Sequence, residues 1–213
     1  PLGYIDCMRV NSGEFIDQYN HQENAIIWLD YASPKKLGEQ LKEIQTLLPK
    51  LKRYDILKVT FNANPESLGN PPGKTAKFKK ERRLHKFKSL LGDNFPNDVN
   101  ESYMDVEGVP IAICKALKYS ANKAMKGCDD DIFQPLTAFS YADSNHQMLT
   151  VTGIIIPEGE VIAFMKETLI EDWTLACKDW NVVKNINIPE LTVKERNFID
   201  SRLPEKNEQE IME

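Results

Sequence analysis

The chain has 213 residues and a mass of 24.4 kDa, with 41% apolar residues and a net charge of −5. This length fits one domain, or one domain with an appendage, and the apolar content excludes wholesale disorder. The acidic balance excludes a protein that coats nucleic acid over its whole surface. No apolar run reaches the length of a membrane span.

Cys7, Cys114, Cys128 and Cys177 are scattered and form no C-x-x-C pair. This pattern favours reduced thiols and a cytoplasmic location over a disulfide framework or a zinc site. More generally, no group of His, Cys, Asp and Glu has the spacing of metal ligands, so no metal site is predicted.

The first segments alternate between predicted strands and helices. Ile5–Val10 predicts a strand, and Ser12 is a candidate N-cap for a short helix after it. The apolar run Ala25–Tyr31 ends on Asp30 and Tyr31, as is typical of an inner parallel strand that is covered on both faces. The carboxyl end of such a strand opens onto a ligand crevice. The alternative is that Asp30 only starts the next loop and caps the helix after it.

A second strand follows an amphipathic helix. The helix is predicted from Ser33 to Pro49, and the strand covers Asp55–Phe61. Two parallel strands joined by one helix form a right-handed βαβ unit. Asn62 comes directly after the second strand and is a candidate contact for a substrate, although turn chemistry explains it equally well.

Residues 64–108 are predicted to form a basic, loop-rich helical insert. Residues 64–73 are rich in helix breakers, and Lys74–Lys88 then carries eight Lys and Arg against the single Glu81. A basic helix beside aromatic residues suits a polyanion, and the alternative is a solvated face beside an acidic patch of the same protein. The candidate nucleic-acid-binding residues are Lys79, Lys80, Arg82 and Arg83.

The remaining sequence predicts a helix, a hairpin and two shorter elements. The helix covers about 109–126, and residues 135–143 and 147–156 form a β-hairpin that closes the far edge of the sheet. A short helix is expected around 160–168. Thr192 and Glu195 have capping-box spacing for a last helix, and residues 205–213 are expected to be a frayed tail.

Four motifs occur in order: Ile27-Trp28-Leu29-Asp30-Tyr31, Val59-Thr60-Phe61-Asn62-Ala63, Tyr141-Ala142-Asp143 with Met148-Leu149-Thr150, and Pro189-Glu190-Leu191-Thr192 with Lys194-Glu195-Arg196. Together they resemble the C-terminal half of class I S-adenosylmethionine-dependent methyltransferases, and more narrowly a bacterial family of proposed O-methyltransferases. The resemblance implies an α/β, Rossmann-like sheet that is mostly parallel and has a C-terminal antiparallel hairpin. It covers residues 1–204 as a partial domain.

The resemblance also implies roles for four residues. Asn11 and Ser12 correspond to positions that hold the adenine edge of the cofactor, and Asp30 and Tyr31 lie beside the transferred methyl group. The implied cofactor is S-adenosylmethionine. By the same correspondence Ile5–Val10 is the third strand, so the sheet lacks its first two strands with their cofactor contacts. The chain alone is therefore not expected to bind the cofactor.

Two functional hypotheses remain at this point. The first is a methyltransferase, complete only with its N-terminal half or a companion subunit, that acts on an oxygen or nitrogen acceptor. The second is a non-catalytic module that binds nucleic acid or a partner protein through its basic insert. The open side of a partial sheet leaves an edge strand with unpaired backbone groups. A second copy of the chain that pairs with this edge is therefore another candidate partner.

Overall fold

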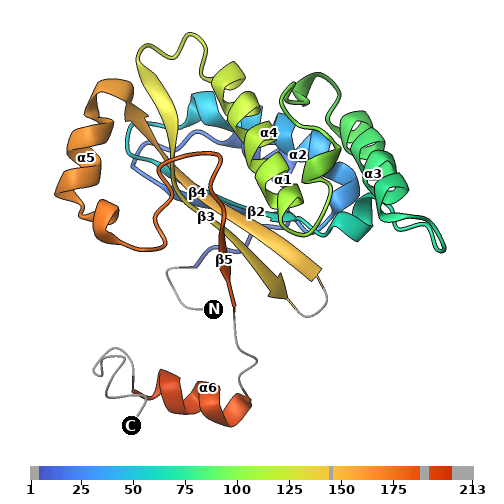
Figure 1. Ribbon diagram of the computed structural model, residues 1–213. Helices are drawn as coiled ribbons and strands as arrows, with labels where there is room; N and C mark the ends of the chain where they lie inside the picture. The colour runs from blue at the N-terminus through green and yellow to red at the C-terminus, as the bar shows by residue number, and fades with distance from the viewer. Residues whose placement is uncertain (1–4, 144–145, 188–191, 203–213) are drawn as a thin grey trace.

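The computed structural model describes residues 5–143, 146–187 and 192–202. One five-stranded sheet runs through it in the order β1-β2-β4-β3-β5 (Figure 1). The strands are β1 Ile26–Asp30, β2 Ile56–Asn62, β3 Asp131–Asp143, β4 His146–Pro157 and β5 Lys184–Ile186. The α-helices are α1 Ser12–Gln18, α2 Leu37–Leu47, α3 Ala76–Leu91, α4 Gly108–Ala124, α5 Val161–Glu167 and α6 Val193–Asp200. The 3-10 helices are η1 Pro34–Lys36, η2 Leu48–Lys50, η3 Pro65–Leu68, η4 Gly92–Asn94, η5 Glu101–Tyr103, η6 Glu158–Glu160 and η7 Ile170–Asp172.

The sheet is mixed. β1 pairs with β2 in parallel, and α2 joins them, which confirms the predicted βαβ unit. β4 lies between β2 and β3 and runs antiparallel to both. β5 adds a short parallel pairing outside β3. The hairpin is therefore confirmed, but the prediction that it closes the far edge is wrong. The outermost strand β5 has only three residues, too few for a periodic sequence pattern.

The main core lies between one face of the sheet and the helices α2 and α4. Leu41 and Ile44 of α2 are fully buried, as are Leu57 and Phe61 of β2. Full burial of each such side chain contributes roughly 1.5–3 kcal/mol. On the other face a smaller cluster packs Met165 of α5 against the hairpin strands. Tyr31 and Phe61, at the carboxyl ends of β1 and β2, belong to the main core.

β1 is an edge strand of this sheet and is buried on one face only, so the prediction of an inner strand covered on both faces is wrong. Its residues alternate between buried and exposed, and Ile26 and Trp28 are 77% and 58% exposed. Because Ile26 and Trp28 face outward and are also apolar, the sequence conceals this alternation. Trp28 is held in place by its indole N–H, which donates to Thr60 Oγ1 at 3.0 Å, and by Lys58 Nζ, 4.0 Å from the ring centroid.

The segment before α1 also differs from its prediction. Residues 5–11 form no strand, so the strand predicted at Ile5–Val10 is wrong. The short helix after it is confirmed, with Asn11 rather than Ser12 as the N-cap. Asn11 Oδ1 accepts the N–H of Glu14 at 2.9 Å and the Glu14 carboxylate accepts the N–H of Asn11, so the two form a capping box.

The later helices follow their predictions closely. α3, α4 and α5 lie where the sequence places them, and α6 begins with the predicted capping box of Thr192 and Glu195. α6 lies apart from the sheet and the other helices (Figure 1). The predicted tail 205–213 and the motif residues 189–191 lie outside the described residues. Among the described helices, none has both the length and the apolar character needed to cross a membrane.

Candidate functional site

Two parallel strands end side by side at one edge of the sheet. Asp30, the last residue of β1, pairs in register with Thr60 of β2, and Asn62 ends β2 two residues later. Ligands of open α/β sheets bind beyond the carboxyl ends of such strands. A functional site is therefore expected at this edge, and two pockets lie along it.

The first pocket brings together the four residues assigned by the methyltransferase resemblance. It has a volume of about 610 Å³ and lies between β1 and the segment that leads into α1. Asn11 and Ser12 line it from the start of α1, and Asp30 and Tyr31 from the end of β1. The other lining residues are Asp6, Met8, Val10, Phe15, Ile26, Ile27, Trp28 and Leu29.

Asp30 presents an accessible carboxylate to this pocket. The residue is exposed, and within the described part of the chain no side chain or backbone group bonds to its carboxylate. Its backbone is fixed all the same, because the next N–H, that of Tyr31, donates to Thr60 O at 2.9 Å. A positioned carboxylate without an internal partner can accept a proton or attract a cation.

Tyr31 is in the opposite situation. Its ring is buried and lies 6.0 Å from the ring of Phe61, and its hydroxyl donates to Glu43 Oε2 of α2 at 2.6 Å. Burial, and after it the Glu43 carboxylate, raises the pKa of Tyr31 well above its usual value, against a weaker opposite effect of Ser12. The phenol therefore stays protonated at neutral pH. It joins the end of β1 to α2 and holds the wall of the pocket.

Replacing Tyr31 with phenylalanine tests this role. We expect a loss of about 2 kcal/mol in the free energy of unfolding, because the variant leaves the half-buried Glu43 without its donor. The folded pKa of Tyr31 lies above the unfolded value of 10.0, so this contribution is full below about pH 10 and declines as the pH rises further. Denaturant unfolding of both proteins from pH 7 to 11 measures it. A constant difference between them at every pH would contradict the assignment.

The second pocket contains Asn62 and is separate from the first. Its volume is about 580 Å³, and its lining residues are Ala32, Pro34, Asn62, Asn64, Ser67, His146 and Met148. Asn62 Oδ1 also accepts the N–H of Asn64 at 3.1 Å, so turn chemistry and exposure to the pocket occur together. The antiparallel register pairs Asn62 with Met148 and brings His146 to the same pocket. A contact between such distant segments leaves no local signal in the sequence.

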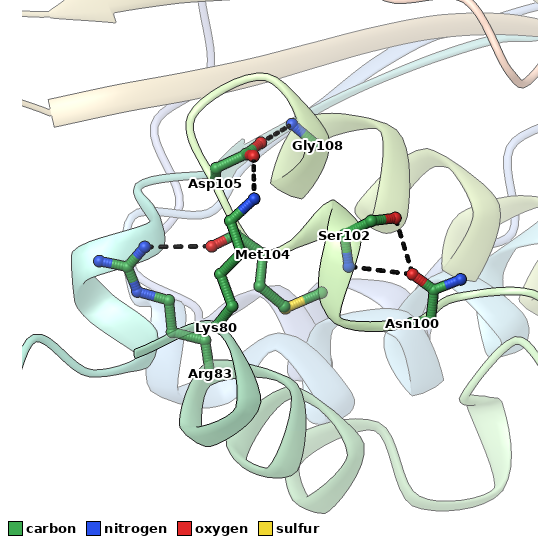
Figure 2. A network of polar contacts seen from close by, with 7 residues as sticks. All are labelled: Lys80, Arg83, Asn100, Ser102, Met104, Asp105 and Gly108. Atoms are coloured by element: carbon green, nitrogen blue, oxygen red, sulfur yellow. Dashed lines mark hydrogen bonds and ion pairs between the residues drawn. The ribbon is translucent and has the colours of Figure 1, made fainter. Parts of the chain in front are cut away.

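Two of the four predicted nucleic-acid contacts are engaged within the protein (Figure 2). Lys80 Nζ lies 2.5 Å from Asp105 Oδ2, and Asp105 Oδ1 accepts the N–H of Gly108 at the start of α4. Arg83 donates to Gly69 O at 2.9 Å and to Met104 O at 3.0 Å. The contacts with Asp105 and Met104 attach α3 to the loop before α4, and the contact with Gly69 attaches it to the end of η3.

Asp105 is the centre of this network. Partial burial acts to raise the pKa of Asp105, but the Lys80 ammonium and the N–H of Gly108 outweigh it and lower the pKa below its usual range. The loop itself is shaped by Asn100, whose Oδ1 accepts from both the backbone and the hydroxyl of Ser102 (Figure 2). Lys79 and Arg82 are not part of the network. Among the described residues, the side chains of Lys79 and Arg82 form no hydrogen bond or ion pair.

No group of three or more His, Cys, Asp or Glu among the described residues could hold a metal ion. The site consists of a carboxylate, an asparagine, a serine and a buried phenol at the end of an edge strand. With its open mixed sheet and helical layer, the chain is consistent with a methyltransferase fold.

A family model described as "Putative O-methyltransferase" matches residues 1–213, and the chain belongs to this family. No curated protein matches the chain. Membership of this family supports methyl transfer as the activity.

Proposed function

We propose that this chain forms the transfer side of an S-adenosylmethionine-dependent methyltransferase of class I, acting on an oxygen or nitrogen acceptor. The observation that carries the proposal is the first pocket. Asn11, Ser12, Asp30 and Tyr31 come from two separate segments, and all four line this one cavity. Family membership independently supports methyl transfer.

The residues of the first pocket fit one end of the cofactor. Asn11 uses its Oδ1 as the helix cap and keeps its amide N–H groups for a ligand, and Ser12 adds a hydroxyl beside it. These are groups that can hold the edge of an adenine ring. No glycine lines the pocket, so the described residues do not offer the close backbone approach that suits the amino-acid end of the cofactor.

Asp30 has the chemistry that the transfer step needs. When bound, S-adenosylmethionine supplies an electrophilic methyl group on a positively charged sulfur. The Asp30 carboxylate attracts that charge and accepts the proton that an acceptor hydroxyl or amine loses as it is methylated. Tyr31 acts through position: its bond to Glu43 fixes the backbone that carries Asp30.

A further contributor completes the cofactor site in this proposal, either another polypeptide segment or a companion subunit. Two observations support this contributor. No described strand pairs with the outer edge of β1, and the apolar side chains of Ile26 and Trp28 are exposed. An unpaired strand edge is a template for another strand. We call the chain together with this contributor the native assembly.

Calorimetry with S-adenosylhomocysteine tests the proposal on two preparations. We expect residues 1–213 alone to bind it only in the millimolar range, and the native assembly to bind it in the micromolar range. Micromolar binding by the isolated chain would refute the need for a second contributor but leave the methyltransferase assignment intact. No binding by either preparation would refute the assignment itself.

A further inference from the structure

The lysines and arginines of α3 form two groups, according to whether their side chains face the rest of the protein or the outside. With about 3.6 residues per turn, Leu84, Phe87 and Leu91 lie on the inner side of the helix, and the latter two are buried. Lys80 and Arg83 reach the protein from the borders of that side (Figure 2). The opposite side of the helix carries a second row of cations, the outer stripe.

This outer stripe consists of Lys79, Arg82 and Lys86, at positions i, i+3 and i+7 of α3. Arg82 and Lys86 are exposed and Lys79 is half-buried, and no carboxylate in the described part of the chain pairs with any of the three. Three neighbouring cations without counter-charges repel one another and destabilise the bare helix. Such an arrangement favours a polyanionic ligand.

We propose that the outer stripe of α3 binds single-stranded nucleic acid through its phosphates. Residues 74–88 carry a charge of +7 in a chain whose net charge is −5, so the remainder carries −12. A positive strip on a negative body attracts a polyanion to one place and repels it elsewhere. Spread over about 10 Å of helix, the three cations match several consecutive phosphates rather than one.

The exposed ring of Phe78 favours a single-stranded nucleic acid over a duplex as the ligand. The Phe78 side chain is 41% exposed on the flank of the stripe, four residues before Arg82. Lys74 Nζ lies 5.5 Å from its ring centroid, so a further cation lies beside the ring. An exposed aromatic ring next to a cationic strip is the arrangement on which unpaired bases stack. Paired bases in a duplex are not available for such stacking.

The internal contacts of α3 make this surface rigid. Arg83 fixes the helix to Gly69 and Met104, and Lys80 fixes it to Asp105. The cations of the stripe are thus presented on a helix whose orientation is already set, which reduces the entropy that a ligand must offset on binding.

Fluorescence anisotropy with labelled 20-nucleotide single strands of RNA and of DNA, the matching duplex and a polyglutamate peptide tests the proposal. The test variant is Lys79→Glu/Arg82→Glu/Lys86→Glu. The control is Lys126→Glu/Lys166→Glu/Lys194→Glu, which changes net charge equally at exposed lysines outside α3. Circular dichroism confirms that both variants fold. A third variant, Phe78→Ala, examines stacking.

We expect the stripe variant to lose about 100-fold in affinity for the single strand at 0.1 M salt, with the slope of log K against log salt falling by about 2. The control is expected to retain most of its binding. Phe78→Ala should weaken single-strand binding about tenfold and leave duplex binding unchanged. Binding of RNA, of DNA or of both supports the proposal and identifies the source.

Three results would overturn it. They are the absence of binding to either single strand by the unmodified protein, equal losses in the stripe and control variants, and stripe-dependent binding of polyglutamate without nucleic acid. Because none of these measurements involves methyl transfer, they succeed or fail independently of the proposed function.

Discussion

Replacing Asp30 by alanine should lower the rate of methyl transfer by the native assembly at least about 100-fold, the usual contribution of a positioned proton acceptor. The carboxylate is exposed to the first pocket and has no partner within the described residues, so its removal leaves no internal group unpaired. The fold is therefore expected to survive. Transfer of a tritiated methyl group from S-adenosylmethionine measures the rate.

A matched control separates the role of Asp30 from a general effect of charge. Asp172 is also exposed, lies in η7, and its replacement by alanine should leave the rate within twofold of the unmodified protein. Asp30→Ala should also weaken binding of S-adenosylmethionine more than binding of S-adenosylhomocysteine, which lacks the positive charge on sulfur. An unchanged rate in a folded Asp30→Ala protein would remove this residue from the mechanism.

Replacing Gly38 by alanine should give the largest loss of stability among the variants considered. Gly38 is buried in the first turn of α2, where a Cβ atom would lie 2.0 Å from the carbonyl oxygen of Leu90 near the end of α3. Neither backbone can retreat without opening the contact between the two helices. We expect a loss of about 3 kcal/mol, which for a chain of this size lowers Tm by about 10 °C.

Gly159 provides the comparison for this substitution. A Cβ at Gly159 meets no atom within 4 Å, so Gly159→Ala should change the free energy of unfolding by less than about 0.5 kcal/mol. Thermal unfolding followed by circular dichroism measures both variants. Equal melting temperatures for the two would show that α2 and α3 are not packed as closely as described.

The elements with strong local signals were predictable from the sequence. η1 begins with Pro34 and leads into α2, which has a regular apolar stripe, and α6 has a complete capping box. The pairing of β1 with β2 followed from their connection by one helix, since such a crossover places parallel strands side by side. For the candidate site, the resemblance implied roles for Asn11, Ser12, Asp30 and Tyr31. All four line one pocket, and their roles stay predictions.

What the sequence did not reveal depends on contacts between distant segments. Trp28 is exposed because no other element covers the outer face of β1, which no property of the strand's own residues encodes. The burial of Tyr31 depends on Glu43 of α2, and the internal roles of Lys80 and Arg83 depend on a loop about twenty residues further along. In each case local chemistry is compatible with either role, and tertiary packing determines which one the side chain takes.

Ultraviolet cross-linking of tritiated S-adenosylmethionine to the native assembly, followed by peptide mapping, tests the central claim most directly. The first pocket predicts label on peptides that contain Asn11–Ser12 or Asp30–Tyr31, and loss of that label with excess S-adenosylhomocysteine. Specific label confined to the second pocket, at Asn62 or His146, would contradict the claim, as would label that an excess of the competitor does not displace.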